Sequence, residues 1–312
     1  MHIPVLIEEA VEWLAIRPEG VYVDATAGAG GHSRAILENL TTGRLIALDK
    51  DPLAIEIAQE ALLPYRHKLT LVNEDFTGLF QLLRRLQFTG VDGILADLGY
   101  SQMQIETPGR GFSLKAEGPL DMRMNPNERL TAGEIVNRFG ERALAGLIYK
   151  FGEERRSQRI ARAIVRARPI RSTVHLADLI EACLGGRQAA SRAIGKRIHP
   201  ATRTFQALRI AVNRELELLE AFLQAAPECL APQGRLVIIS FHSLEDRIVK
   251  RQFQQWARAG RMRNLTRHVV RPAPSEVWAN QRSRSARLRA AERLPESSPA
   301  GSPEAAGETG DS

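Results

Sequence analysis

Short apolar runs dominate the first hundred residues, and the segments between them have apolar residues at the three- to four-residue interval of a helix. Runs typical of buried parallel strands occur at 21–23, 44–49, 69–73 and 91–97. A lead-in helix is predicted within residues 1–20, and Asp51-Pro52 begins another that reaches about Leu62. Strands that alternate with helices predict an α/β fold with a mainly parallel sheet.

The pattern changes after the fourth apolar run. From about Gly109 to Arg197 only helical spacing is present, most clearly at 153–168. We therefore predict a small all-helical domain at 109–197, inserted into a sheet domain formed by 1–108 and 198–294. Residues 295–312 are rich in Pro, Ser, Gly and Glu, and are predicted to form a disordered acidic tail.

The second half of the sheet domain is predicted from four further segments. Residues 199–220 read as one long amphipathic helix, and 231–247 as a turn, a fifth buried strand and the start of a helix. Ser243 and Asp246 have the spacing of a capping box for that helix. Closing strands are predicted near 265–270 and 286–292.

Composition limits the class of protein. The chain has 312 residues, of which 44% are hydrophobic and 25% charged, as in soluble globular proteins. No stretch approaches the ~20 apolar residues of a membrane span, and acids interrupt the early apolar residues where a secretory signal would lie. The two cysteines, Cys183 and Cys229, have no ligand spacing. We expect a cytoplasmic protein with no membrane association, no disulfide and no metal site.

The charge is basic, and mostly from arginine. The net charge is +7, and the four acids and no bases of 295–312 leave +11 on the remainder. Arginine binds phosphate bidentately, which indicates a nucleic-acid partner; a high-GC genome explains the same bias, and both readings stay open. Arg155, Arg159, Arg162 and Arg166 share one helix face. That stripe is either a phosphate-binding surface or a solvated face partly neutralised by Glu153 and Glu154.

A glycine turn follows the first predicted strand. Asp24, Gly28 and Gly30 match the D-x-x-x-G-x-G turn of S-adenosylmethionine-dependent methyltransferases. A dinucleotide site requires G-x-G-x-x-G, and Ser33 occupies its third glycine position. The turn alone leaves both cofactors open.

Acidic residues recur where the predicted strands end. Asp49, Asp75 and Asp97 follow three of them, and ligands bind at this edge of an open α/β sheet. Asp49 suits ribose hydroxyls, and Asp75 with Phe76 suits adenine. His242, after the fifth strand, is predicted to face the same edge.

At this point the chain resembles one family, the bacterial 16S rRNA (cytosine-N4)-methyltransferases. The similarity covers nearly the whole chain except the tail. The matching runs are H-I-P-V-L (2–6), D-A-T-A-G-A-G-G-H-S (24–33), D-G-I-L-A-D-L-G (92–99), R-G-F-S (110–113), G-P-L-D-M-R-M (118–124), Y-K-F-G-E-E-R (149–155), H-P-A-T-R-T-F-Q-A-L-R-I-A-V-N (199–213), S-F-H-S-L-E-D-R-I-V-K (240–250) and R-S-R-S-A-R-L-R-A-A-E-R (282–293).

The resemblance implies a Rossmann-like class I methyltransferase sheet with an inserted helical domain. It implies S-adenosylmethionine-dependent N4-methylation of a decoding-centre (P-site) cytosine in 16S rRNA, within the small ribosomal subunit. The implied cofactor contacts are Gly30, Gly31, His32, Asp49, Phe76, Asp97 and Gln104. The oligomeric state stays open, with a homodimer as one option.

Two stretches depart from the family pattern. Ala27 and Ala29 stand where the family has a more glycine-rich turn, and the residues from Tyr100 to Gln104 replace its usual V-S-S-P-Q-L. Tyr100 follows Asp97 at the spacing of the aromatic residue in amino-group methyltransferases, so we predict that it stacks on the target base. The resemblance implies that this second stretch borders both the cofactor and the target base.

Asp97 is the best candidate to accept hydrogens of the target amine, with His242 and Ser240 as second choices; the alternative is that Asp97 only binds the cofactor. Other functions remain to be separated by experiment. They are methylation of another RNA cytosine, a nicotinamide-dependent oxidoreductase on the same fold, and a non-catalytic RNA-binding or ribosome-assembly protein. Ser33 argues against the oxidoreductase, and Asp49, Asp97 and the glycines argue against a protein that only binds RNA.

Overall fold

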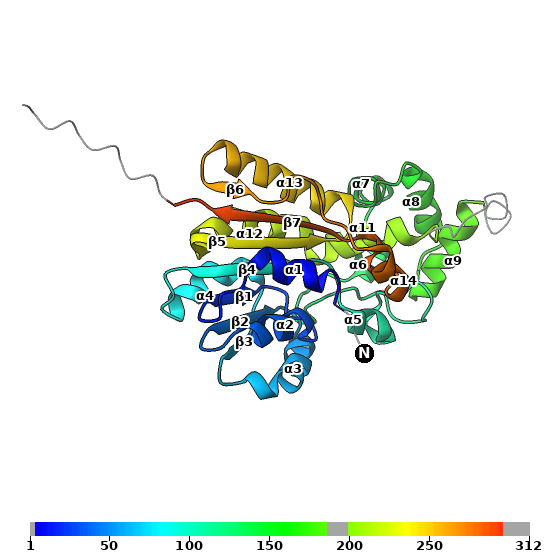
Figure 1. The fold of residues 1–312 in the computed structure, drawn as a ribbon. Coiled ribbons are helices and arrows are strands. Elements are labelled where there is room, and N and C mark those ends of the chain that lie inside the picture. Colours follow the sequence, from blue (N-terminus) through cyan, green and yellow to red (C-terminus); the bar gives the residue numbers. More distant parts are fainter. Residues whose placement is uncertain (1–3, 186–198, 296–312) are drawn as a thin grey trace, which may run out of the picture.

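Seven strands form one sheet in a computed structural model that describes residues 4–185 and 199–295 (Figure 1). The strand order is β3-β2-β1-β4-β5-β7-β6. Strands β1 to β5 are parallel, and β7 pairs antiparallel with both β5 and β6. This is the strand order of class I methyltransferases, so the predicted fold class is confirmed. The strands are β1 (Val21–Asp24), β2 (Arg44–Asp49), β3 (Leu69–Asn73), β4 (Val91–Asp97), β5 (Leu230–Ser240), β6 (Met262–Asn264) and β7 (Arg287–Arg293).

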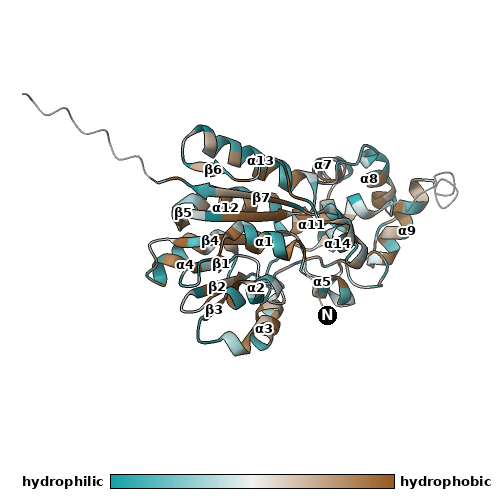
Figure 2. Cartoon of the chain, viewed as in Figure 1, coloured by the Kyte–Doolittle hydropathy of each residue, from teal (hydrophilic) through white to brown (hydrophobic). Residues whose placement is uncertain are grey.

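Each face of the sheet is covered by its own helices. Alternate residues of a strand point to opposite faces, so Leu45 and Ala47 enter one hydrophobic cluster and Ile46 and Leu48 the other. Figure 2 shows apolar residues along β5, which lies next to the middle strand β4, and polar residues over much of the outer side of α13. One face packs against α1 (Ile7–Leu14), α2 (Gly31–Asn39) and α3 (Pro52–Ala61), and the other against α4 (Leu79–Arg85), α12 (Glu215–Cys229) and α13 (Ser243–Arg258).

A third hydrophobic cluster lies beside the sheet. It extends from Leu120 to Val212, past the predicted domain boundary at 197. Its helices are α6 (Ala132–Arg138), α7 (Glu141–Gly152), α8 (Ser157–Arg166), α9 (Thr173–Cys183) and α11 (Thr202–Asn213). The division into two domains stays a prediction, and the tail predicted at 295–312 lies outside the described residues except for residue 295.

The arginine stripe is exposed, and the acids beside it pair elsewhere. Ile160, Ala161 and Ile164 of α8 are buried in the third cluster. Glu153 pairs with Arg247, and Glu154 with Arg156 and Arg203, so these two acids are not the partners of the stripe. Of the four stripe residues, Arg162 pairs with Glu141. The exposed stripe residues are Arg155, Arg159, Arg162 and Arg166.

Three local predictions were wrong. Residues 199–220 form two helices, because Arg214 adopts a left-handed conformation (φ 50°, ψ 33°) that ends α11 and begins α12. The capping box of α13 uses His242 and Glu245, one residue before the predicted pair. At 265–270 there is no strand but an isolated bridge from Val270 to Leu288, and β6 lies earlier.

Two shorter helices complete the edge of the sheet where the parallel strands end. They are α5 (Gln102–Glu106), after β4, and α14 (Pro274–Ala279), before β7; short 3₁₀ turns occur at Leu63–Tyr65, Phe76–Gly78, Pro108–Arg110 and Ser283–Ser285. Within 4–185 and 199–295, the helices are all too short or too polar to traverse a lipid bilayer.

Candidate active site

A cavity of about 370 Å³ opens at the carboxyl ends of β1, β2 and β4. β1 and β4 are neighbours at the point where the strand order reverses, which is where open α/β sheets bind ligands. Remote segments complete the wall: Pro4 and Val5 from the start of the chain, and Asn280 and Arg282 from its end. The glycine turn and these remote segments therefore line the same cavity, which the sequence pattern does not predict.

Asp24 fixes the glycine turn from below. It is fully buried, accepts a hydrogen bond from the Thr26 N–H at 3.1 Å, and accepts one from the Ser33 hydroxyl at 2.6 Å. Burial raises the pKa of Asp24 to about 6, and the bond from Ser33 opposes that rise. Ser33, which occupies the third glycine position of a dinucleotide motif, thus has a structural role as the partner of Asp24.

Asp49 connects the turn to β2. Its Oδ2 accepts the Gly28 N–H at 2.8 Å and its Oδ1 accepts the Asp51 N–H at 2.9 Å. Burial raises the pKa of Asp49 to about 6. A Cβ at Gly28 would meet only the Thr26 carbonyl oxygen, at 4.0 Å, so there is open space beside this part of the turn.

The three predicted turn contacts differ in position. Gly31 and His32 line the cavity, whereas Gly30 does not. Gly30 precedes α2 with a φ of +84°, and a Cβ there would lie 3.1 Å from Leu62. Gly30 therefore shapes the turn, since this backbone conformation is one that glycine adopts at little cost.

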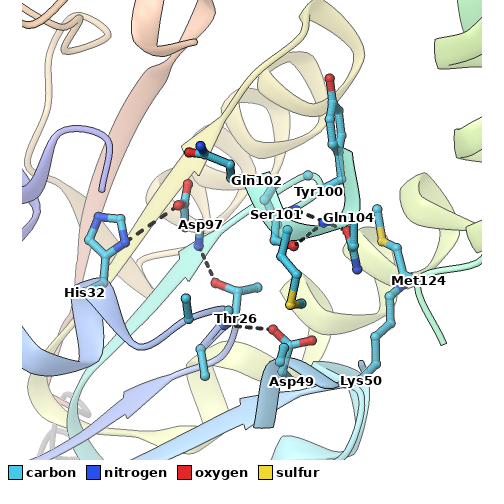
Figure 3. A pocket seen from close by; sticks show the side chains of 18 of the residues that line it. Thr26, His32, Asp49, Lys50, Asp97, Tyr100, Ser101, Gln102, Gln104 and Met124 are labelled. Carbon is cyan, nitrogen blue, oxygen red and sulfur yellow. Dashed lines mark hydrogen bonds and ion pairs between the residues drawn. The ribbon is translucent and has the colours of Figure 1, made fainter. Parts of the chain in front are cut away.

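Asp97 and His32 face each other across the cavity floor (Figure 3). The His32 Nε2–H group donates to the Val5 carbonyl oxygen at 3.0 Å, which leaves the Nδ1 lone pair facing Asp97. Nδ1 lies 3.6 Å from Asp97 Oδ2. Burial lowers the pKa of His32 to about 4, so the imidazole is neutral near pH 7.

One oxygen of the Asp97 carboxyl group has no hydrogen-bond partner among the described residues. Only 21% of its side chain is exposed, and its Oδ1 is buried without a hydrogen-bond partner among the described residues. Its backbone N–H donates to the Thr26 hydroxyl at 2.7 Å, which fixes the end of β4 against the turn. Burial raises the pKa of Asp97 well above its usual value, and the carboxylates of Asp24 and Glu245 add to the rise. The site thus offers a poorly solvated acceptor at its centre.

Gln104 belongs to a buried polar network. It forms a capping box with Ser101 at the start of α5, and its Nε2 donates to Asp51 Oδ2 at 2.8 Å. The Arg110 guanidinium lies 2.9 Å from the same oxygen and donates to the carbonyl groups of residues 123 and 124. The network holds the segment after β4 against the start of α3.

Asp75 and Phe76 lie on the cavity wall as a pair. Asp75 Oδ1 accepts the Thr77 N–H at 3.0 Å and its hydroxyl at 2.8 Å. The Phe76 ring packs on Phe222 of α12, with centroids 5.0 Å apart. Carboxylate and aromatic groups are therefore available to a planar heterocycle at this end.

Tyr100 stands at the opposite end of the cavity from Asp49 (Figure 3). Its ring stacks on Phe112 with centroids 5.9 Å apart, and the Arg209 guanidinium carbon lies 4.5 Å from the ring centroid. Arg209 is buried and binds Glu215 through two hydrogen bonds of 2.9 Å. Tyr100 is thus held by two neighbours while 43% of it stays exposed.

His242 and Ser240 do not line the cavity. His242 caps α13, where its Nδ1 accepts the Glu245 N–H at 3.4 Å and its Nε2 lies 3.2 Å from Glu245 Oε1. The Ser240 hydroxyl donates to the Arg287 carbonyl oxygen. Both second-choice acceptors are occupied by protein groups. His242, Glu215 and Glu245 bring ligand-type atoms within 4.8 Å of one another, yet Glu215 is already neutralised by Arg209.

Several wall residues belong neither to the glycine turn nor to a strand end, although they lie in the matching runs 2–6, 240–250 and 282–293. Val5, Glu245 and Arg282 reach the cavity from three distant segments. Arg209 acts behind the wall, through Tyr100 and Glu215. A motif search finds the turn and the strand ends, because those positions follow from the order of strands. Contacts between remote segments require the folded chain.

The cavity fits S-adenosylmethionine by the chemistry of its donors and acceptors. Asp49 and Asp75 offer carboxylate oxygens to ribose hydroxyls and to an adenine amine, and Phe76 offers an aromatic ring. The Asp97 carboxyl group, which lines the cavity, suits an ammonium group. Apolar wall residues such as Ala54 and Ile57 suit the remaining uncharged surface.

Comparisons with known proteins agree with this geometry. Residues 1–294 match the model of the MraW methylase family. Ribosomal RNA small subunit methyltransferase H of Koribacter versatilis (strain Ellin345) is 52% identical over 94% of each chain. The protein of the same name from Solibacter usitatus (strain Ellin6076) is 49% identical over 94% of this chain and 99% of its own.

Among solved structures, an rRNA methylase from Streptococcus thermophilus is 11% identical, covers 95% of this chain and 100% of its own, and has a TM-score of 0.45. The sheet topology, the donor set of the cavity and the family match identify an enzyme with S-adenosylmethionine as its cofactor. The chain belongs to the MraW methylase family and is an S-adenosylmethionine-dependent methyltransferase.

Proposed function

We propose that this enzyme methylates N4 of the decoding-centre (P-site) cytosine of 16S rRNA within the small ribosomal subunit. The observation that carries the proposal is the poorly solvated Asp97 carboxyl group, which lines the same cavity as the glycine turn and Tyr100. Relatives that are 47–52% identical are named small subunit rRNA methyltransferases, which supports the choice of RNA. A substrate of this kind implies action in the cytoplasm.

The proposed cofactor contacts follow the cavity wall. Gly31, His32 and Asp97 would hold the amino-acid part, Asp49 the ribose, and Phe76 with Asp75 the adenine. Gln104 also lines the cavity and would contact the cofactor there, held by its bond to Asp51, whereas Gly30 would act indirectly through the shape of the turn. S-adenosylmethionine supplies an electrophilic methyl group when bound.

Asp97 would position the amine and receive its proton. The exocyclic nitrogen of cytosine is a weak nucleophile, so alignment with the methyl carbon provides a large part of the rate enhancement. A carboxylate oxygen in a poorly solvated site would orient an N–H group and would accept its proton as the methyl group passes from sulfur to nitrogen. The Nδ1 lone pair of His32, 3.6 Å away, provides a neutral acceptor beside Asp97.

Tyr100 would hold the base. The target cytosine has to leave its stack to reach Asp97, and aromatic rings stabilise such bases by stacking. Arg209 and Phe112 fix the ring of Tyr100, which reduces the entropy lost when a base binds.

The helices from 109–197 would form a separate RNA-binding domain inserted in the sheet domain of 1–108 and 198–294. The third hydrophobic cluster, which also includes residues of α11, is distinct from those of the sheet, and the exposed arginine stripe of α8 suits phosphate groups. A different RNA cytosine is the competing target, and the position of the transferred methyl group distinguishes the two.

The test is methyl transfer from labelled S-adenosylmethionine to small subunits that lack the mark, followed by nuclease digestion and mass spectrometry. We expect one methyl group, on N4 of one decoding-centre cytosine. Transfer to another nucleotide would contradict the proposed target, and cofactor binding without transfer to any RNA would contradict the proposed reaction. Size-exclusion chromatography with light scattering, run on the active sample, gives the oligomeric state.

A further inference from the structure

Trp278 is the most exposed large hydrophobic residue among those that the structure describes. It lies on α14, and 85% of its surface is accessible, whereas Trp256 is 2% exposed. Single exposed apolar residues are common and need no explanation on their own. Trp278 is of interest because its helix lies next to the cavity and is flanked in the sequence by arginines without carboxylate partners in the described part of the chain.

The segment that carries Trp278 forms part of the cavity rim. Asn280 and Arg282, two and four residues further on, line the same cavity as Asp97 and Tyr100. In Figure 1, α14 lies at the carboxyl edge of the sheet, on the side of the third cluster. A base that enters the cavity would bring its neighbouring nucleotides to a rim that includes this segment.

The segment is also fixed in place. Glu276 of α14 accepts the Leu6 N–H at 2.9 Å, and Leu6 is buried in the core of the sheet. Behind α14, buried Ser283 donates its hydroxyl to the Asn280 carbonyl oxygen at 2.8 Å. The indole is therefore presented by an anchored element, which is what a stacking surface requires.

Positive charge without a carboxylate partner surrounds this helix in the sequence. Arg271, Arg282 and Arg284 lie within seven residues of Trp278, are exposed, and have no carboxylate within 4.0 Å in the part of the chain that the structure describes. The negative charge of α14 is on Glu276, whose carboxyl is bonded to Leu6 and faces Glu8 and Glu9 of α1. Phosphate groups would thus find guanidinium groups without carboxylate partners, among the described residues, on the segments that flank Trp278 in the sequence.

We propose that Trp278 is a stacking platform for an unpaired RNA base adjacent to the methylated nucleotide, with Arg282 and Arg284 on the flanking phosphates. This inference rests on the proposed RNA substrate and adds a binding subsite to it. Aromatic side chains stack on any base face, and arginines follow the backbone, so the subsite recognises single-stranded RNA irrespective of sequence.

The test compares Trp278→Ala, Trp278→Phe and, as a matched control, Leu63→Ala, which removes another exposed apolar side chain (57% exposed). Removal of one stacked base weakens binding by about five- to 150-fold. We expect Trp278→Ala to raise the Kd and KM for unmethylated small subunits at least about fivefold, with unchanged S-adenosylmethionine affinity. Trp278→Phe should recover most of the loss, and Leu63→Ala should match the wild type.

Two further readouts separate stacking from loss of structure. Small subunits or an unstructured oligoribonucleotide should quench the tryptophan emission of the wild type, and Trp278→Phe should abolish most of that quenching, because Trp13 and Trp256 are less exposed. Arg284→Gln should reduce the slope of log affinity against log salt by about 0.7, whereas Trp278→Ala should leave it unchanged.

Failure of this inference is distinguishable from failure of the proposed function. If the wild type methylates small subunits and Trp278→Ala matches it in Kd and KM, the platform is wrong, the function stands, and the exposed indole is left for a protein partner. If the wild type transfers no methyl group, the stacking platform is tested only by whether the oligoribonucleotide quenches the tryptophan emission. Absence of quenching at low salt overturns the platform.

Discussion

At the scale of single residues, the site is built from buried ionisable groups whose pKa values depart from their usual range. Burial raises the pKa of Asp24 and Asp49 to about 6 and lowers that of His32 to about 4. The hydrogen bond from His32 to the Val5 carbonyl fixes the tautomer whose lone pair faces Asp97. The neutral form of His32 is thus the functional form near pH 7, and it links stability to pH.

His32 should make the protein less stable in acid. Its pKa is depressed in the folded state, so between pH 6.5 and 4 the unfolded chain binds a proton that the folded chain does not. The free energy of unfolding falls through that window as the pH falls, by on the order of 2 kcal/mol between pH 7 and 5 from this group. Asp24 and Asp49 act in the opposite direction, because their raised pKa values add stability as the pH falls through 6.

The comparison of His32→Gln with the wild type cancels the two aspartates. Urea unfolding at pH 7 and pH 5 should show that the variant loses about 2 kcal/mol less than the wild type. His67→Gln, at an exposed position, serves as the control and should follow the wild type. Equal losses for His32→Gln and the wild type would contradict a buried neutral imidazole.

Much of the site could be predicted from the sequence, because several of its residues directly follow the ends of predicted strands. Asp49, Asp75 and Asp97 follow strand ends, and parallel strands bring their ends to one edge. His242 also follows a strand, yet it caps α13 and leaves the cavity wall to Glu245 and Phe241. Position after a strand locates a residue at the edge, but the hydrogen bonds of the folded chain decide which way its side chain turns.

At the scale of elements, the apolar pattern predicted the strands and most helices but missed a break within one amphipathic stretch. Apolar spacing continues through 199–220, since both α11 and α12 bury one face. Arg214 nevertheless takes a left-handed conformation, which directs α11 into the third cluster and α12 onto the sheet. The spacing of apolar residues shows only which positions are buried. Because α11 and α12 each bury one face, the spacing continues across Arg214 although the helix does not.

The break between α11 and α12 predicts that glycine at position 214 is more stabilising than alanine, the reverse of their order in a helix interior. In a helix interior glycine is about 1 kcal/mol less stable than alanine, whereas at a left-handed position alanine carries a penalty of about 1–2 kcal/mol that glycine avoids. Arg214→Gly should therefore exceed Arg214→Ala in free energy of unfolding by about 1 kcal/mol. Thermal or urea unfolding of the two variants measures the difference. A more stable alanine variant would indicate the continuous helix.

At the scale of the whole molecule, buried charges connect the sheet to the segment that leads into the third cluster. Asp51 starts α3, its side chain is 1% exposed, and it binds both Arg110 and Gln104. Arg110 in turn holds the backbone of residues 123 and 124, and Met124 lines the cavity. The shape of the cavity therefore depends on a pair of charges that neither segment's local pattern predicts.

Loss of one partner should be costly. Arg110→Met leaves the Asp51 carboxylate buried without its cation, which destabilises a protein by about 3–5 kcal/mol. The double variant Arg110→Met with Asp51→Asn should recover part of that loss, because no charge is then left unpaired. Arg138→Met, which breaks an exposed pair with Glu134, should cost under about 1 kcal/mol. Similar losses from Arg110→Met and Arg138→Met would show that the buried pair does not connect the two regions.

The most direct test of the account is single-turnover methyl transfer to unmethylated small subunits by Asp97→Asn, with S-adenosylmethionine affinity measured in parallel. The substitution keeps the shape of the side chain and removes its ability to receive a proton. We predict that N4-methylcytosine forms at least about 100-fold more slowly at saturating cofactor, the size expected for loss of a general base. Transfer within about tenfold of the wild-type rate would contradict the central role of the Asp97 carboxylate, and would reduce it to a cofactor contact.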